Sequence, residues 1–269
     1  MDGPTQSSLR CDDRDGVARL TLNRPEAFNS LSRDLLGNLE RELGRIAADR
    51  SVRVVVIAGS GKAFCAGHDL KEMAADLRPE PIRGLFEQCS RVMLGLTRLP
   101  QPVIASVHGI ATAAGCQLVA ACDLAVCSDD SRFATSGVKY GLFCSTPMVA
   151  LSRNVPRKAA LEMLLTGDFI DAAEALRLGL VNQVVPPAAL DTAVDHLCAR
   201  LTDKPAAVLA LGKRAFYRQL EQGLEQAYAT TTDAIVENAM GIDFAEGLAA
   251  FVGKRKPVWP DAGLACDPA

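Results

Sequence analysis

The stretch PVIASVHGIATAAGCQLVAACDLAVCS, residues 102–128, holds a strand–helix–strand pattern. The run at 102–109 is short and apolar, a small-residue helix is predicted from about residue 113, and DLAVCS at 123–128 is a second strand. Strands that alternate with helices lie parallel in one sheet and are joined by right-handed connections. This stretch therefore predicts an α/β fold.

The chain before this stretch fits the same class. Asp15-Gly16 separates the alternating runs SLRCD and VARLTLN, which predicts a β-hairpin. The segment 29–49, NSLSRDLLGNLERELGRIAAD, has helical periodicity, with Ser32 as its N-cap. VRVVVIAGSG at 52–61 is a nearly continuous β-branched run that ends at glycines, as in a strand buried on both faces.

After about residue 150 the sequence becomes helical. Gly167 and Gly179 stand where helix C-terminal glycines belong, and VNQVVP is the only strand predicted in this part. The predicted helical segments are RKAALEMLLTG, DAAEALRLGL, ALDTAVDHLCARL, AVLALGKRAFYRQLEQGLEQAYATTTDAIVENA and FAEGLAAFVGKRK. The chain thus has a sheet-rich front and a helical tail.

Charge and hydropathy exclude several classes of partner. A net charge of −3 and a pI of about 5.7 provide no basic surface for nucleic acid. No apolar run approaches the roughly 20 residues that span a bilayer. The opening MDGPTQSSLRCDDRDG lacks the basic and apolar regions of a signal peptide. We therefore expect a cytoplasmic protein without a membrane partner.

The cysteines and histidines show no metal-binding pattern. Nine cysteines include no C-x-x-C pair, and most of them lie in apolar segments, so reduced and buried thiols are predicted. Three scattered histidines add no metal-ligand spacing. No metal site is therefore expected.

Two loops place backbone amides at strand ends, where ligands gather in open α/β sheets. GSGKAFCAGHDLKEM, residues 59–73, follows the buried strand, and GIATAAG, residues 109–115, follows the next one. Each loop leads into a helix, whose unpaired N–H groups suit an oxyanion. We predict that each loop aims one N–H at a common point. A plain strand-to-helix turn and tight packing of small residues are the alternative interpretations.

Five segments carry a resemblance to a known family. They are LNRPEAFNSL, GKAFCAGHDLKEM, PVIASVHGIATAAGCQLVAACDLAV, LLTGDFIDAAEALRLGLVNQVV and EGLAAFVGKRKPVW. In this order, over roughly residues 8–259, the chain resembles the enoyl-CoA hydratase/isomerase, or crotonase, superfamily. Within it, ATAAGCQLVA, GLFCSTP and KRKPVW are most similar to the subgroup called enoyl-CoA hydratase domain-containing protein 3.

The resemblance implies an architecture and a ligand. The fold would be an α/β crotonase (ClpP-like) spiral of ββα units over residues 1–200, followed by a helical oligomerisation region over residues 201–269. The ligand would be an acyl-CoA thioester, with coenzyme A as part of the substrate and no separate cofactor. The assembly would be a homotrimer or a dimer of trimers, and the reaction that of a lyase or an isomerase.

The resemblance also implies roles for particular residues. The two oxyanion amides fall at His68 and Ala114, and the family usually has glycine at the second position. Phe251 and Lys254 resemble residues that reach the CoA nucleotide, often from a neighbouring subunit. The other positions that would contact CoA are Glu26, Ala27, Phe28, Ala66, His68, Asp69, Leu70 and Lys71.

Both glutamates that hydratases of this family use are replaced. The first falls at Gln117 and the second at Gly137. A glutamine orients a water or a carbonyl but does not exchange a proton near neutral pH, and a glycine offers no side chain. Because losing one general acid–base group costs about 10²–10⁴-fold in rate, we expect weak hydration of enoyl-CoA.

Other residues leave alternative reactions open. His68 can carry a proton, and AGHDL resembles the methylmalonyl-CoA decarboxylase branch of the superfamily. The thiol of Cys144 would act as an acid or nucleophile if its pKa were lowered, and otherwise lines the pocket. The alternatives to an enolate-stabilising hydratase relative are therefore a malonyl-type decarboxylase, a thioesterase, and a CoA-ester binder without catalysis.

Overall fold

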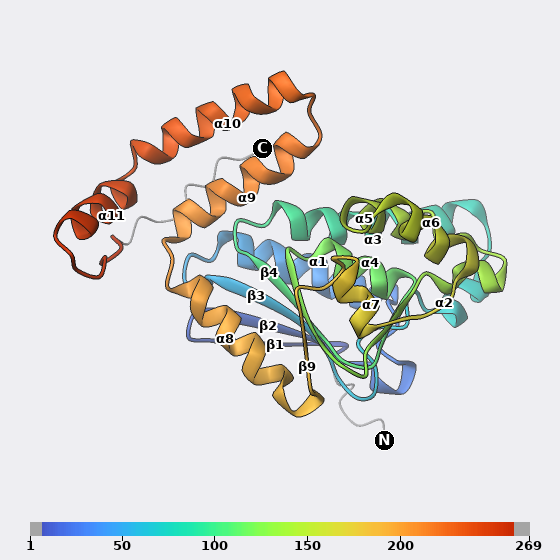
Figure 1. Cartoon of the computed structure of the whole chain (residues 1–269). Helices are drawn as coiled ribbons and strands as arrows, with labels where there is room; N and C mark the ends of the chain where they lie inside the picture. The colour runs from blue at the N-terminus through green and yellow to red at the C-terminus, as the bar shows by residue number, and fades with distance from the viewer. Residues whose placement is uncertain (1–6, 261–269) are drawn as a thin grey trace.

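The computed structural model describes residues 7–260. Figure 1 shows a twisted sheet with helices on both faces and a helical tail that leaves this body. Within the described residues the larger sheet has six strands in the order β1-β2-β3-β4-β6-β9. Their bounds are β1 Leu9–Arg14, β2 Val17–Leu22, β3 Val54–Gly59, β4 Val103–Val107, β6 Leu124–Ser128 and β9 Gln183–Val185.

The predicted hairpin and parallel strands are confirmed. β1 and β2 pair antiparallel around Asp15 and Gly16, whose positive φ angles of 52° and 77° close the turn. β2, β3, β4, β6 and β9 pair parallel. The helix predicted over the segment 29–49 is also present, and the Ser32 side chain accepts a hydrogen bond from the amide of Leu35 as its N-cap.

A second, smaller sheet lies beside the first. Its strands are β5 Ile110–Thr112, β7 Arg132–Ala134 and β8 Ile170–Asp171, in the order β5-β7-β8. The expectation that VNQVVP is the only strand after about residue 150 was wrong, because β8 pairs with β7 there. A two-residue strand carries no periodicity that the sequence could show.

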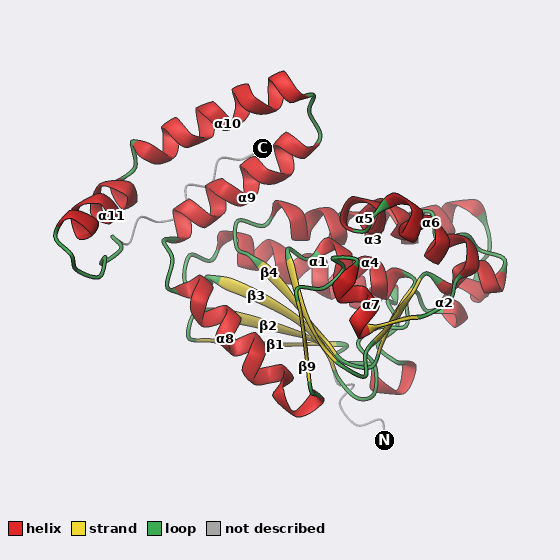
Figure 2. Cartoon of the chain, in the orientation of Figure 1, coloured by secondary structure: helices red, strands yellow, loops and turns green. Residues whose placement is uncertain are grey.

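Helices cover the sheet unequally, as Figure 2 shows. β3 separates two cores: Val55 and Ile57 belong to the large cluster that includes α1 residues, whereas Val54 and Val56 pack with α8. This alternation explains why β3 is apolar at successive positions. The helices of the body are α1 Arg33–Ala48, α2 Leu70–Ala75, α3 Pro79–Arg98, α4 Ala114–Ala121, α5 Pro147–Asn154, α6 Arg157–Thr166, α7 Ala172–Arg177 and α8 Leu190–Thr202, with 3₁₀ turns η1 Pro25–Ala27, η2 Ser136–Tyr140 and η3 Pro187–Ala189.

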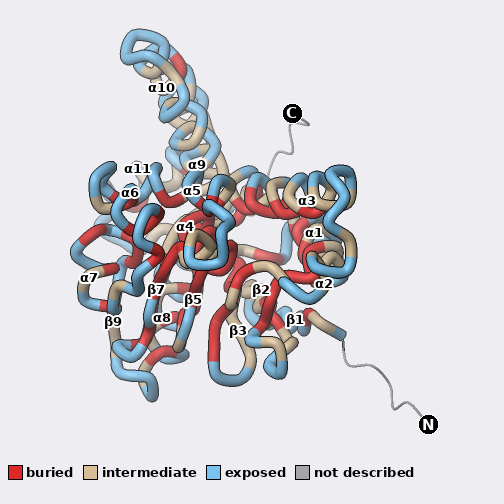
Figure 3. Tube along the Cα trace, turned by 90° about the vertical axis from the view of Figure 1, so that its right-hand side faces the viewer, coloured by how far each residue is buried: buried red, intermediate tan, exposed pale blue. Residues whose placement is uncertain are grey.

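The tail consists of α9 Ala206–Leu220, α10 Leu224–Ala239 and α11 Ile242–Val252. The long segment predicted as helical is broken near Gly223, which is the N-cap of α10. Figure 3 shows α9 and α10 rising from the body, with residues that are almost all of intermediate burial or exposed. A buried network anchors α9: Lys213 Nζ lies 2.6 Å from an Asp123 carboxylate oxygen, and the Tyr217 hydroxyl donates to the same carboxylate at 2.7 Å.

The described cysteines are free, and all but Cys11 are buried, as predicted. Cys266 lies outside the described residues. Over residues 7–260 no cluster of His, Cys, Asp and Glu has metal-binding geometry. None of the described helices combines the length and the hydropathy that crossing a membrane requires.

Candidate active site

The two predicted amide-bearing loops lie against each other. The amide of Phe64 donates to the carbonyl of His108 at 3.0 Å, and the amide of Cys65 donates to that of Ile110 at 3.1 Å. In return, the amide of Thr112 donates to the Cys65 carbonyl at 3.0 Å. The segment after β3 is thus held as a short parallel partner of β5, and both loops arrive at the same place.

Missing side chains allow this close approach. A Cβ atom added to Gly67, whose φ is 92°, would lie 2.9 Å from the Ala113 Cβ and 3.3 Å from the Ala114 amide nitrogen. One added to Gly115 would lie only 2.1 Å from the Cys65 carbonyl oxygen. The small residues are therefore required by packing, and the same packing sets Gly67 beside the amide of Ala114.

The residue before α4 has an unusual backbone conformation. Ala113 adopts φ 51° and ψ −118°, which an L-residue rarely takes, and its own amide is bound to the Ala134 carbonyl at 2.9 Å. Within the described residues, neither the amide of Ala114 nor that of His68 donates a hydrogen bond. Two unpaired N–H groups thus follow Gly67 and Ala113, where the loops touch.

The imidazole of His68 is held against α3. Its ring meets that of Phe86 edge-on, with centroids 5.0 Å apart. Both ring nitrogens are buried and reach no partner at hydrogen-bonding geometry. Burial lowers the pKa of His68 to about 4, although the nearby Leu31 carbonyl opposes this shift. The ring is therefore neutral near pH 7.

Asp69 has a structural role in holding the first loop. Its carboxylate accepts from the amides of Lys71 and Glu72 as the N-cap of α2, and it pairs with Arg24 at 2.8 Å. Burial opposes ionisation, but the hydrogen bonds from Arg24 and from these amides leave the pKa of Asp69 below its usual value. The carboxylate is therefore ionised, and it already has hydrogen-bond partners within the protein.

The segments predicted to contact CoA divide into two groups. Glu26 and Ala27 lie in η1, and the Phe28 carbonyl accepts from the Ala66 amide at 3.0 Å, so this group joins the loop that bears His68. Leu70 and Lys71, which begin α2, are exposed beside it.

Phe251 and Lys254 form the second group. They lie at the end of α11, and Figures 1 and 3 both place α11 and α2 on opposite sides of the molecule. Both residues are exposed, Phe251 to 82%. The structure therefore does not bring them to the first group within one chain.

The two positions where the resemblance predicts the hydratase glutamates hold no acid. Gln117 lies on α4, is 4% exposed, and its Oε1 is buried without a hydrogen-bond partner. A Cβ atom added to Gly137 would lie 2.3 Å from the Leu142 carbonyl oxygen and 2.8 Å from the Cys144 Sγ. Position 137 thus has no room for a side chain unless the segment after η2 moves.

Cys144 is buried beside Gly137. Burial raises the pKa of its thiol, and the Gly137 amide opposes this shift only in part. The thiol is therefore protonated near neutral pH, which favours a pocket-lining role over a nucleophilic one.

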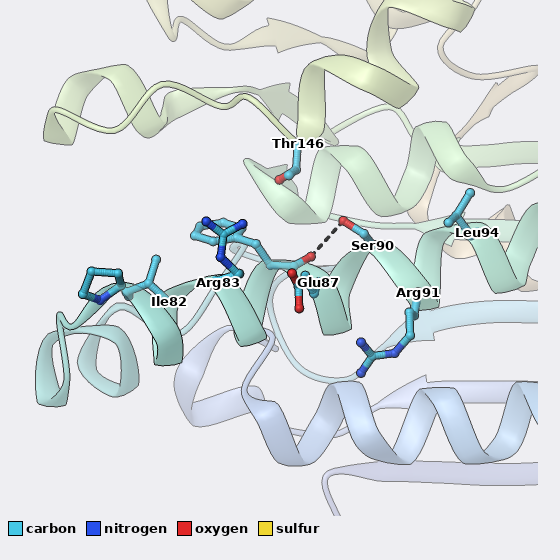
Figure 4. Close-up of a pocket in the computed structure, with 9 residues that line it drawn as sticks. Ile82, Arg83, Glu87, Ser90, Arg91, Leu94 and Thr146 are labelled. Atoms are coloured by element: carbon cyan, nitrogen blue, oxygen red, sulfur yellow. Dashed lines mark hydrogen bonds between the residues drawn. The ribbon is translucent and has the colours of Figure 1, made fainter.

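A groove of about 630 Å³ runs along α3 (Figure 4). Phe86 lines it, and Thr146, which precedes α5, lines its opposite side. Because the Phe86 ring also contacts the His68 ring, one side of the groove lies next to the side chain of His68.

The family follows from comparison with known proteins. The model of the enoyl-CoA hydratase/isomerase family matches residues 12–262. The chain belongs to this family. It is 48% identical to the mitochondrial enoyl-CoA hydratase domain-containing protein 3 of Xenopus laevis, over 91% of this chain and 83% of that protein. It is 33% identical to the short-chain-enoyl-CoA hydratase of Clostridium acetobutylicum, over 89% and 92%.

Solved structures of family members confirm the crotonase fold. An enoyl-CoA hydratase of Mycobacterium smegmatis superposes with a TM-score of 0.92 at 56% identity, covering 94% of this chain and 98% of that one. The human enoyl-CoA hydratase domain-containing protein 3 gives 0.89 at 46% identity, covering 94% and 100%. Relatives named as mitochondrial are at odds with the predicted cytoplasmic location.

Several residues that shape the site were not found from the sequence of this enoyl-CoA hydratase/isomerase family member. Phe86 belongs to α3, a helix that was not predicted, and Ala113 gives no sign of its positive φ. Asn29 is fully buried and donates to the carbonyls of Ser60 and Ala63, which ties the segment containing η1 to the first loop. Apolar spacing at Leu85, Cys89, Val92 and Leu96 is the signal that could have identified α3.

Proposed function

We propose that this family member binds an acyl-CoA thioester and stabilises its enolate between the main-chain amides of His68 and Ala114. The observation that supports this proposal is the pair of unpaired N–H groups at the point where the two loops touch. Fixed amides aimed at a developing oxyanion stabilise it without reorganisation, and burial strengthens their effect.

The same site is poorly equipped for hydration. Hydration of an enoyl-CoA needs one group to take a proton from water and one to deliver a proton to carbon. Gln117 is neutral, Gly137 has no side chain, and the neutral His68 is a weak base with a pKa of about 4. We therefore expect the site to bind the thioester and to stabilise its enolate, but to hydrate an enoyl-CoA only weakly.

Calorimetric titration with butyryl-CoA and with S-butyl-CoA, a thioether that lacks the carbonyl, tests the amide contacts. Hydrogen bonds from two buried amides predict that the thioester binds about tenfold more tightly or better. Equal affinities would contradict the proposal. Gly67→Val, which places atoms beside the Ala114 amide, should remove the difference, whereas Gly44→Ala on α1 has open space around it and should not.

Decarboxylation of a malonyl-type thioester is a second candidate. In that reaction the bond to the carboxylate breaks, CO₂ leaves, and the electron pair moves onto the thioester oxygen, so no base is needed to start it. The enolate then takes a proton from water at its α-carbon. The neutral His68 beside the unpaired amides favours this candidate over hydration. The test is incubation with methylmalonyl-CoA. Release of CO₂ by the natural sequence, lost in His68→Ala while the affinity for the thioester is kept, would support decarboxylation. Recovery of unchanged methylmalonyl-CoA would indicate a non-catalytic binder.

We also propose that the tail assembles copies of the chain into a trimer or a dimer of trimers. Large apolar side chains on α9, α10 and α11 are exposed, among them Phe216, Leu224 and Phe251. Assembly would bury them and bring Phe251 and Lys254 to the CoA segment of a neighbour. Light scattering after size-exclusion chromatography tests this: a monomer at micromolar concentration would contradict it.

A further inference from the structure

The groove on α3 contains one arginine without a partner. Arg83 lies on α3, three residues before Phe86 and thus on the same face of the helix. It forms no ion pair and no hydrogen bond through its side chain with any residue of the described range. Its charge is therefore available at the end of the groove nearer to His68.

The other arginine of the groove already has a carboxylate partner. Arg91 Nε lies 2.7 Å from a Glu40 carboxylate oxygen, and this hydrogen bond raises the pKa of Arg91, with a smaller contribution from the charge of Glu87. Glu87 lies on α3 between the two arginines, four residues from each, and its side chain forms no ion pair with either one. Of the two groove arginines, Arg83 is thus the one without a carboxylate partner among the described residues.

A second polar group faces Arg83 across the groove. The Oγ1 of Thr146 is buried and has no hydrogen-bond partner. Figure 4 shows Thr146 and Arg83 directed toward the same space from opposite sides. A hydroxyl and a guanidinium can both donate to one carboxylate, whereas a hydrocarbon would leave both unsatisfied.

We propose that Arg83 makes this site selective for acyl-CoA thioesters whose acyl chain ends in a carboxylate. The inference rests on the proposed function, because it needs the thioester at the amides of His68 and Ala114. From there the methylene chain passes the ring of Phe86, and the terminal carboxylate reaches the donors of Arg83 and Thr146. Arg83 is thus a specificity residue for the acyl group and takes no part in bond breaking.

Matched pairs of thioesters test the selectivity by calorimetry: glutaryl-CoA against pentanoyl-CoA, and adipoyl-CoA against hexanoyl-CoA. A charge-assisted hydrogen bond predicts that the dicarboxylic member of at least one pair binds about tenfold more tightly. Arg83→Ala should abolish this preference and Arg83→Lys should keep part of it. Arg91→Ala is the matched control in the same groove and should leave the preference unchanged.

The outcomes separate the inference from the proposed function. Equal affinities within both pairs, or a preference that persists in Arg83→Ala, would overturn the inference while acyl-CoA binding stands. Failure of all four thioesters to bind would overturn the proposed function itself. Thr146→Val provides a second variant that keeps the arginine, and it should weaken the preference. The preference should also decrease as salt is raised, because the charges are exposed to solvent.

Discussion

The amide-bearing loops and the two hydratase glutamate positions differ in what builds them. The loops depend on main-chain atoms in close contact, and Gly67 and Gly115 leave no space for other residues. The predicted glutamate positions would act through side chains, and this sequence has Gln117 and Gly137 there. Under the proposed function, different parts of the chain carry oxyanion stabilisation and proton transfer, so the second function can be lost while the first is kept.

Hydration of crotonyl-CoA offers the largest test of this difference. Relative to a family member with glutamate at both positions, two missing groups predict a rate lower by about 10⁴–10⁸-fold. Gln117→Glu should recover at most the part of the hydration rate that one glutamate provides. Gly137→Glu should unfold the segment after η2, because the Leu142 carbonyl occupies the space that the new side chain needs. Product analysis by mass spectrometry measures the hydration rate, and brisk hydration by the natural sequence would contradict this difference.

The loop contact itself is tested by Gly115→Ala. Its methyl group would meet the Cys65 carbonyl, so we expect a loss in the free energy of unfolding of about 3 kcal/mol or more, from overpacking against backbone. Urea denaturation measures the loss, with Gly44→Ala as the control in open space. A loss below about 0.5 kcal/mol, the size typical of surface changes, would show that the loops are not packed together.

Because His68 is buried as a neutral ring, the free energy of unfolding should depend on pH. The folded-state pKa of His68 is about 4, below its ordinary value, so the unfolded chain binds more protons between these values. The stabilisation that the neutral ring provides is fully present above about pH 6.5. It is lost as pH falls toward 4, which lowers the free energy of unfolding by about 3 kcal/mol. Urea denaturation from pH 7 to 4.5 should show a smaller decrease in His68→Phe; equal decreases would contradict burial of a neutral ring.

The smallest effect is expected at Cys144. Because burial raises the pKa of its thiol, the group is uncharged and inert near neutral pH. Cys144→Ser should therefore change thioester affinity by less than about threefold, while an activated nucleophile would be lost completely. Intact-protein mass spectrometry after incubation with acyl-CoA provides the complementary measurement, and an acyl adduct on Cys144 would assign it a catalytic role.

Much of the body could be predicted from local pattern. The hairpin at Asp15-Gly16, the Ser32 N-cap and the strands around residues 52–61 and 102–128 all follow from turn residues and periodicity. The helix α3 was not predicted, because Pro79, Pro81, Gly84 and Gly95 lower the helix propensity of this segment. The two prolines lie in its first turn, where proline is tolerated.

The site could be predicted only in part, because its geometry depends on contacts between distant segments. The glycine pattern predicted that the two loops meet, whereas the roles of the His68 and Ala114 amides come from the resemblance to the family and stay a prediction. The ring contact between His68 and Phe86, and the way Leu142 fills the space at Gly137, join residues whose local sequence carries no sign of either. The positive φ of Ala113 is imposed by its neighbours in the same way.

Acetoacetyl-CoA provides the most direct measurement of enolate stabilisation. Its enolate absorbs in the near ultraviolet, so the apparent pKa of the ligand can be followed free and bound by titration from pH 6 to 9. Two amides directed at the thioester oxygen predict that binding lowers this pKa by about one unit or more. A bound ligand whose pKa is unchanged or raised would contradict an oxyanion site at His68 and Ala114.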